Sequence, residues 1–168
     1  SRNYLRKQTI MPNNTNIELL LYMLDDVRKV TLKGVSGLTK EQLFQPPIAG
    51  EYPVGAYLMH NGEVDLFWLS VASGEKQPED LLKRVYNNCW FDPSEKPAPP
   101  IEPPELDEYI NAITEARDRV RDYLMSLTDE ELETEVTWGN RKMTKKWIFY
   151  HLIEHEAHHR GQMFMLIR

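Results

Sequence analysis

The sequence contains one cysteine, Cys89, among its 168 residues. A single cysteine cannot form a disulfide within the chain, and a thiolate zinc site needs several cysteines, so both features are excluded. A protein without disulfides suits a reducing compartment. We therefore expect a cytoplasmic location.

Long apolar runs and an excess of positive charge are also missing. The most continuous apolar stretch, residues 17–24, is interrupted by Glu18 and is too short to span a bilayer. The formal net charge is −6, whereas general nucleic-acid binding needs a cationic surface. We therefore expect neither a membrane nor a nucleic acid as a partner.

Apolar residues instead recur at helical spacing, and they make up enough of the sequence, 41%, for one hydrophobic core. This spacing predicts four long helices. They begin near residues 15, 53, 105 and 145. Between the second and third helices, residues 87–104 are rich in proline, which predicts a long crossover loop.

Capping and turn motifs mark where several elements begin. Threonine followed three residues later by Glu or Gln matches the capping box of a helix N-terminus. The candidate caps are Thr15 with Glu18, Thr39 with Gln42, Thr128 with Glu131, and Thr144 before the last helix. Residues 136–143 alternate around Gly139 and Asn140, which predicts a small hairpin.

Together these features predict an all-α protein, an up-down four-helix bundle with a long crossover between helices 2 and 3. We place the single domain at residues 14–168. Residues 1–13 are polar and basic, without the apolar run of a signal peptide. We expect them to be a disordered tail or an added segment.

The histidines are concentrated in two of the predicted helices. Of the five histidines, His60 lies in the second helix and the others lie between residues 151 and 159. His155 and His159 are about 40° apart on a helix, within an apolar stripe. His60 likewise shares its face with apolar residues. His158 should point nearer to solvent.

Two histidines at positions i and i+4, with a third from another helix, can hold one divalent ion and leave a position open. A single histidine on an apolar face is more often a hydrogen-bonded core residue. The buried pair is harder to explain in that way, because each imidazole needs a polar partner. We therefore predict a metal site formed by His60, His155 and His159.

Residues 155–159 also match H-E-x-x-H, the zinc-peptidase motif, in which Glu156 would be the general base. The extended motif of one peptidase class needs glycine at 162 and histidine at 165, where this chain has Gln162 and Met165. The sequence therefore does not favour a peptidase. Glu156, and Glu63 one turn after His60, remain candidate catalytic carboxylates.

Residues 155–162, His-Glu-Ala-His-His-Arg-Gly-Gln, resemble the H-x-x-H-H-R-G-Q signature of the DinB/YfiT family of damage-inducible proteins. Residues 37–43 resemble that family's G-L-T-x-E-Q-L segment, and residues 53–60 resemble the stretch leading to its first metal histidine. The resemblance covers residues 14–168. Asn61 and Gly62, which follow His60 in the second helix, depart from the ordinary helix formers of relatives.

The resemblance implies a four-helix bundle that binds Zn²⁺ or Ni²⁺ through His60, His155 and His159. It also implies an enzyme acting on a small molecule, with thiol transfer as the first expectation, since some relatives transfer low-molecular-weight thiols such as bacillithiol or mycothiol. A metal-dependent hydrolase is one alternative. A non-catalytic stress-response protein, with a structural or lost metal, is the other.

A homodimer is a further expectation, because dimers are frequent in the family. An apolar outer face on the last helix agrees with it. This face should comprise Phe149, Ile153, Phe164 and Ile167.

Overall fold

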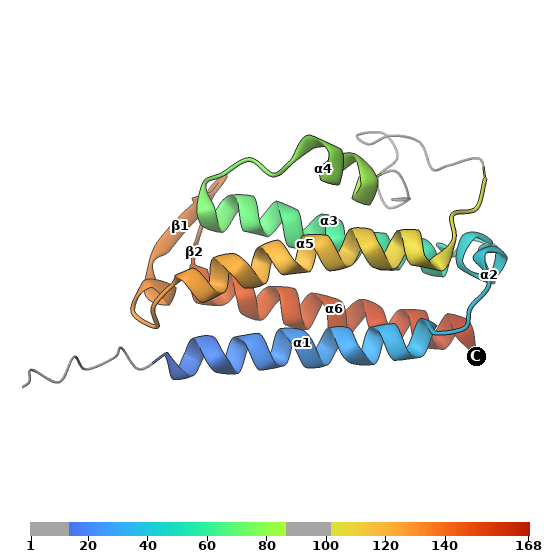
Figure 1. Ribbon diagram of the computed structural model, residues 1–168, viewed down its shortest axis with the longest axis horizontal. Helices are drawn as coiled ribbons and strands as arrows, with labels where there is room; N and C mark the ends of the chain where they lie inside the picture. The colour runs from blue at the N-terminus through green and yellow to red at the C-terminus, as the bar shows by residue number, and fades with distance from the viewer. Residues whose placement is uncertain (1–13, 87–101) are drawn as a thin grey trace, which may run out of the picture.

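The computed structural model of the protein describes residues 14–86 and 102–168. Four long helices lie side by side in these ranges (Figure 1). They are α1 (Thr15–Val35), α3 (Val54–Ser73), α5 (Leu106–Ser126) and α6 (Lys145–Ile167). The predicted tail at residues 1–13 and most of the predicted crossover loop lie outside the described residues.

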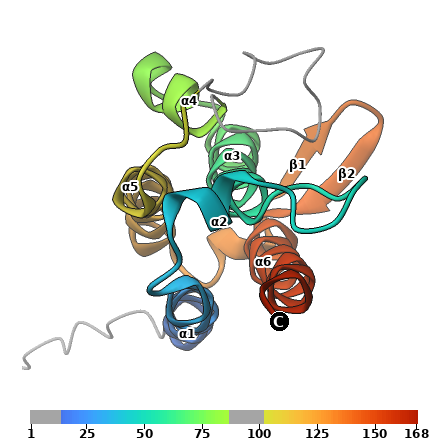
Figure 2. The ribbon, with the colours of Figure 1, turned by 90° about the vertical axis from the view of Figure 1, so that its right-hand side faces the viewer.

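Consecutive long helices reverse direction at two of their three connections. α1 and α3 are antiparallel, and so are α5 and α6, whereas α3 and α5 run the same way (Figure 1). Seen end-on, α3 lies beside both α5 and α6, and α1 lies beside α6 (Figure 2). The parallel pair explains why a long connection is needed between α3 and α5.

Two short helices lie in the connections between the long ones, α2 (Lys40–Phe44) between α1 and α3 and α4 (Glu79–Tyr86) between α3 and α5 (Figure 1). α2 packs on α3, as predicted from the Thr39 capping box, whose two hydrogen bonds are both present. The helix α4 was not expected from the sequence. Its Leu81 and Val85 are fully buried against α3 and α5.

A hairpin joins α5 to α6. After a short 3₁₀ turn, η1 (Glu131–Glu133), strand β1 (Glu135–Trp138) pairs antiparallel with β2 (Arg141–Thr144). Gly139 has φ +57°, and no other residue type in the described ranges has positive φ, which fits a type II′ turn. The predicted hairpin is confirmed.

Thr144 and Thr128 cap as predicted, but Thr15 does not. The Thr144 hydroxyl accepts a hydrogen bond from the Trp147 amide at the start of α6. Thr15 is instead the first residue of α1, and the carboxylate of Asp129 accepts bonds from the amides of residues 16 and 17. The predicted capping box was wrong because a residue distant in sequence occupies that position.

The apolar residues of α6 do not form the outer face that was predicted. Phe149 is only 1% exposed and belongs to the core. Ile153, Phe164 and Ile167 are half-buried and pack against the core. This part of the prediction was wrong because α6 contacts both α1 and α3, which cover a wide arc of its surface.

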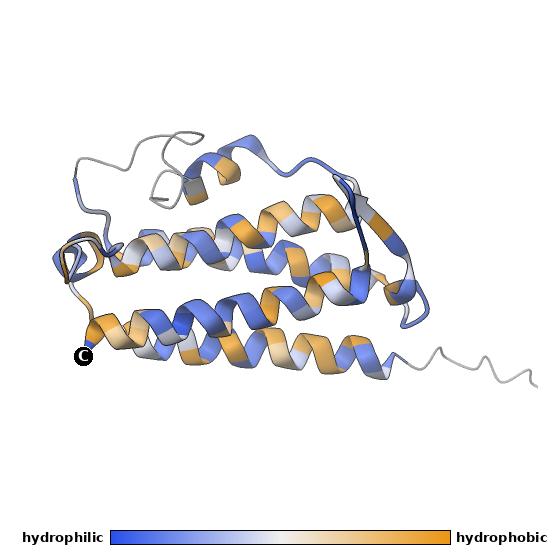
Figure 3. Ribbon diagram, turned by 180° about the vertical axis from the view of Figure 1, so that it is seen from behind, coloured by the Kyte–Doolittle hydropathy of each residue, from blue (hydrophilic) through white to orange (hydrophobic). Residues whose placement is uncertain are grey.

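Each long helix carries both hydrophobic and hydrophilic residues along its length (Figure 3). The hydrophobic ones form two separate buried clusters. Leu24, Val120 and Leu152 belong to the cluster near the hairpin. Met59, Ile113 and Met163 belong to the cluster near α2.

Four of the buried charged residues form an ion network in the interior, to which each long helix contributes one. Arg28 of α1 and Arg117 of α5 alternate with Asp65 of α3 and Glu156 of α6, and none is more than 7% exposed. Glu156 accepts from Arg28 at 2.9 Å and from Arg117 at 2.7 Å. Asp65 accepts from Arg117 at 2.8 and 3.1 Å and from Arg28 at 3.3 Å.

The formal charges of this ion network cancel, so no net charge is buried. Each guanidinium also donates to a backbone carbonyl, Arg28 to that of Ile113 and Arg117 to that of Leu24. Burial alone would raise the pKa of Glu156, but the two arginines lower it to about 2. Glu156 is therefore ionised at neutral pH.

Glu156→Gln should destabilise the fold strongly. The substitution keeps the side-chain shape but leaves two buried arginines with one carboxylate, and breaking a buried pair costs about 3–5 kcal/mol. Urea denaturation followed by circular dichroism measures the change. Glu79→Gln, which breaks the exposed pair with Lys83 on α4, is the control and should change stability little. Equal midpoints for the two variants would contradict the role given to the network.

Candidate metal centre

The structure brings together His60 from α3 and His155 and His159 from α6. One ring nitrogen from each lies within 4.8 Å of the others, and the three residues are half-buried. The Nε2 atoms of His60 and His155 are 3.2 Å apart. Within the described residues, these three form a group that could hold one metal ion.

The positions of these histidines follow from the ion network. His155 precedes Glu156 on α6, and His60 lies five residues before Asp65 on α3. Because Glu156 is completely buried, its neighbour is held at the edge of the buried face, where α6 meets α3. The histidines therefore lie beside the core and retain partial access to solvent.

The other ring nitrogens of two histidines have oxygen partners. His60 Nδ1 lies 3.4 Å from Glu63 Oε2, and His159 Nδ1 lies 2.6 Å from Gln162 Oε1. A nitrogen that donates to such an oxygen carries the ring proton, which leaves Nε2 as the lone-pair atom. Both contacts thus favour the tautomer in which Nε2 faces the group.

The electrostatic surroundings also keep the imidazoles of His155 and His159 neutral. Burial lowers the pKa of His155 to about 2, and the neighbouring His60 and His159 act in the same direction. Burial likewise lowers the pKa of His159 to about 4, although the Gln162 bond opposes this shift. Neutral imidazole is the form that binds metal, so these rings are ready for an ion at neutral pH.

The donor set fits a borderline metal such as Zn²⁺ or Ni²⁺. Imidazole suits both ions, whereas Mg²⁺ and Ca²⁺ prefer oxygen ligands. Three histidines with two outer partners match the usual construction of a catalytic zinc site.

A family model described as the DinB superfamily matches residues 23–163. The chain belongs to this superfamily. The family resemblance predicted from the sequence is therefore confirmed.

Two solved structures support the DinB-like fold. A DinB-like protein from Bacillus cereus ATCC 10987 is 25% identical, with a TM-score of 0.70 over 90% of this chain and 91% of that one. A conserved protein from Enterococcus faecalis is 15% identical, with a TM-score of 0.70 over 93% and 95% of the two chains. The search of curated proteins found no match.

Gly62, the departure from the family pattern, is explained by close packing. A Cβ at this position would lie 3.0 Å from a methyl group of Ile113 and 3.1 Å from one of Val85. Helix α3 continues unbroken through Gly62. The glycine lets α4 and α5 approach α3 closely on the side away from the histidines.

The two candidate carboxylates occupy different places. Glu63 is 6% exposed and contacts His60 at Nδ1, the nitrogen that faces away from His155. Glu156 binds the two buried arginines. Catalytic roles for either residue stay predictions, and these contacts favour positioning for Glu63 and a structural role for Glu156.

The two remaining histidines on α6 lie around the group. His158 is exposed, as expected, although its ring centroid is 5.1 Å from that of His159. His151 is half-buried, with its ring 5.8 Å from that of His155. Neither belongs to the group that could hold an ion.

Three members of the ion network were missed by the sequence analysis. Arg28, Asp65 and Arg117 each interrupt the buried face of a helix. The available signal was one charged residue on the apolar stripe of each long helix, with charges that sum to zero. That signal identifies the residues but not which of them pair.

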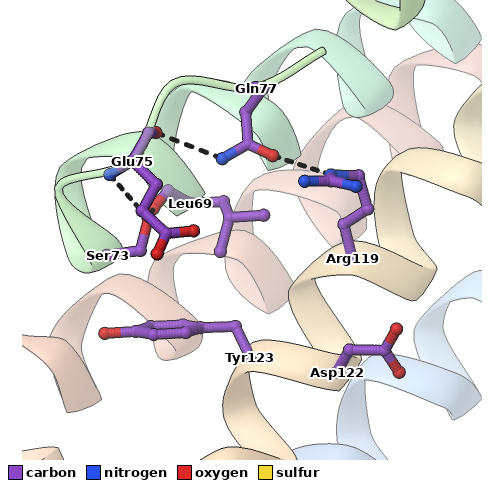
Figure 4. Close-up of a pocket in the computed structure, with 7 residues that line it drawn as sticks. All are labelled: Leu69, Ser73, Glu75, Gln77, Arg119, Asp122 and Tyr123. Atoms are coloured by element: carbon purple, nitrogen blue, oxygen red, sulfur yellow. Dashed lines mark hydrogen bonds between the residues drawn. The ribbon is translucent and has the colours of Figure 1, made fainter.

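A separate hollow of about 140 Å³ lies between the end of α3 and α5 (Figure 4). Its polar side chains bond one another: Arg119 donates to Gln77, and Gln77 donates to the Glu75 carbonyl. Tyr123 donates to the Ala72 carbonyl. These bonds tie the segment after α3 to α5, and no histidine lines the hollow.

The described residues include no helix with the length and apolar character needed to cross a membrane.

We expect the protein to bind about one divalent ion per chain through the three histidines. Alanine at His60, His155 or His159 removes one ligand and should abolish stoichiometric binding, measured by mass spectrometry of the purified protein. His158→Ala is the matched control and should bind metal normally, because it removes an exposed imidazole beside the group. Unchanged metal content in His155→Ala or His159→Ala would contradict the assignment.

Glu63→Gln separates a positioning role from a ligand role in the same measurement. Loss of an outer partner typically lowers metal affinity about 10–100-fold while the ligands remain. The variant should therefore still reach full occupancy at high metal concentration.

Proposed function

We propose that this DinB protein is a metal-dependent enzyme that transfers a low-molecular-weight thiol to an electrophilic small molecule. The observation that carries the proposal is the convergence of three imidazoles without a carboxylate in the same group. Three protein ligands leave a position for a reactant, whereas structural zinc sites usually have four.

The partial exposure of the histidines supports a catalytic rather than a structural role. All three are half-buried at the edge of the bundle, so a small molecule can approach them. A Zn²⁺ or Ni²⁺ ion bound there would supply positive charge that lowers the pKa of a thiol or water. Glu63 and Gln162 orient His60 and His159.

The positions of the carboxylates favour thiol transfer over hydrolysis. Hydrolysis benefits from a general base within hydrogen-bond reach of the attacking water. Glu156 is engaged by Arg28 and Arg117, and Glu63 contacts the outer nitrogen of His60. A thiol needs less help from a base, because its pKa of about 8.5 is already close to neutral.

The proposed reaction is a substitution at carbon. The thiol loses its proton, its sulfur forms a bond to the electrophilic carbon, and the bond to the leaving group breaks. With a chlorinated substrate the products are a thioether, chloride and a proton.

Metal-loaded protein should conjugate a thiol with a chlorinated or epoxide electrophile, measured by mass spectrometry of the thioether. His155→Ala should lose this activity, and His158→Ala should retain it. A parallel assay uses activated esters without thiol. Ester turnover without conjugation would replace the proposal with a hydrolase. Inactivity in both assays would favour a non-catalytic role.

We also propose that the protein is a homodimer that uses an exposed face of α1. Leu19, Tyr22, Met23 and Val30 are 54%, 69%, 37% and 37% exposed and lie on one side of the helix. This α1 face replaces the α6 face expected from the sequence, where Phe149 is buried. An apolar stripe of this kind is typical of an interaction site.

Sedimentation at micromolar concentration should give a species of about twice the 19.8 kDa chain mass. Replacing Leu19 and Met23 together by glutamate should shift it to the monomer, because two charges would be buried in the interface. Met165→Glu, at a methionine of α6 that is 76% exposed, is the control and should leave the dimer intact. A monomeric wild-type protein would contradict the proposal.

A further inference from the structure

Aromatic rings lead away from the histidines along the side of the bundle where α3, α6 and the hairpin meet. His151 lies beside His155 and stacks on Trp147, with ring centroids 4.8 Å apart and planes 6° from parallel. Trp68 of α3 contacts Trp147 and, at 5.7 Å, Trp138 of the hairpin. The rings thus connect the candidate metal centre to the hairpin.

Three aromatic rings that contact Trp68 remain open to solvent. Phe67, Trp138 and Trp147, here called the aromatic face, are 37%, 44% and 37% exposed. Trp68, which contacts all three, is only 7% exposed and is the ring that anchors the hairpin. Anchoring alone does not explain why the other three large rings stay exposed together.

A hollow of about 410 Å³ adjoins the aromatic face, lined by β2 and Trp147. Its volume lies within the range typical of small-molecule sites. The Thr144 hydroxyl accepts a bond from the Trp147 amide, which fixes this ring relative to the hairpin.

Arg141 gives this hollow a positive charge beside its aromatic wall. It pairs with Trp138 directly across the hairpin, so both side chains project from the same face of the two strands. Arg141 is exposed and lines the hollow. Lys142 also lines it, but it forms an ion pair with Glu135 at 3.2 Å.

We propose that the aromatic face and Arg141 bind the non-reacting part of the substrate, a planar aromatic group that carries a carboxylate or similar anion. The rings offer stacking surfaces, and Arg141 offers the complementary charge. This inference rests on the proposed function, because it assumes that the reacting atom lies at the three histidines.

The spacing along α6 sets the size of this substrate. Trp147 and His155 are eight residues apart, about 12 Å along a helix. A bicyclic group with its anion at one end and its reactive carbon at the other is suited to this distance. A single-ring electrophile covers less of this distance.

Binding is tested with 2-naphthoate, measured by titration calorimetry on the metal-loaded wild-type protein and on variants. Trp147→Leu should weaken binding about threefold to tenfold, the loss expected for one stacking partner. Tyr150→Leu, at a tyrosine of α6 that is 51% exposed and does not line the hollow, is the matched control and should bind normally. Equal affinity of wild type and Trp147→Leu would overturn the proposal.

Two further probes separate stacking from charge. Cyclohexanecarboxylate carries the anion without a planar ring, and naphthalene-2-carboxamide carries the ring without the anion. Both should bind more weakly than 2-naphthoate to the wild type. Arg141→Gln should reduce the preference for the anion, whereas Lys33→Gln on α1 should not. Equal binding of all three probes would overturn the proposal.

The metal-ligand variant keeps this inference distinguishable from the proposed function. His155→Ala should lose thiol conjugation but still bind 2-naphthoate, because the aromatic face is formed by α3, the hairpin and the start of α6. With 6-(chloromethyl)-2-naphthoate as the electrophile, Trp147→Leu should raise KM and leave kcat nearly unchanged. Conjugation with an unchanged KM in this variant would reject the aromatic face while leaving the proposed enzyme intact.

Discussion

The ion network of Arg28, Asp65, Arg117 and Glu156 is the constraint on which the rest of the structure depends. Each long helix contributes one charge, and a buried charge without its partners is strongly unfavourable. Two apolar clusters could tolerate small sliding movements of the helices, because dispersion and hydrophobic contacts have little directionality. The ion network between the two clusters cannot tolerate such sliding, because its hydrogen bonds require defined atoms at defined distances. Its main effect is therefore to specify how far each helix lies along its neighbours.

The candidate metal centre depends on that relative position of α3 and α6. His155 is next to Glu156, and His60 is one and a half turns from Asp65, so fixing the two carboxylates also fixes the three imidazoles. The two acidic residues near the histidines have different partners in this arrangement. Glu156 pairs with the buried arginines in the core, whereas Glu63 contacts Nδ1 of His60. The result is a convergent set of ring nitrogens at the boundary between core and solvent, which is where a reactant can meet a bound ion.

The hairpin extends this boundary into a larger surface. It packs on α3 and α6 through Trp138 and Trp68, on the same side of the bundle as the histidines. The segment between α2 and α3 also lies on that side, as Figure 2 shows. Its Tyr52 contacts Tyr57, which contacts His159 in turn. Aromatic rings thus flank the three histidines in both directions along the bundle, so the reactive position and the apolar surface form one continuous region.

The sequence alone determined the features that depend on short-range spacing. Positions i and i+4 place His155 and His159 on one side of any helix, Thr39, Thr128 and Thr144 cap locally, and a glycine with positive φ turns the hairpin. The tertiary structure decided the rest, because it depends on partners far apart in the chain. Asp129 caps α1 across more than a hundred residues, Phe149 is buried because α6 has neighbours on two sides, and Glu156 meets arginines from two other helices. A helical pattern gives the direction of a side chain around its own axis. Which charged or aromatic partner lies in that direction is determined only when the helices pack against one another.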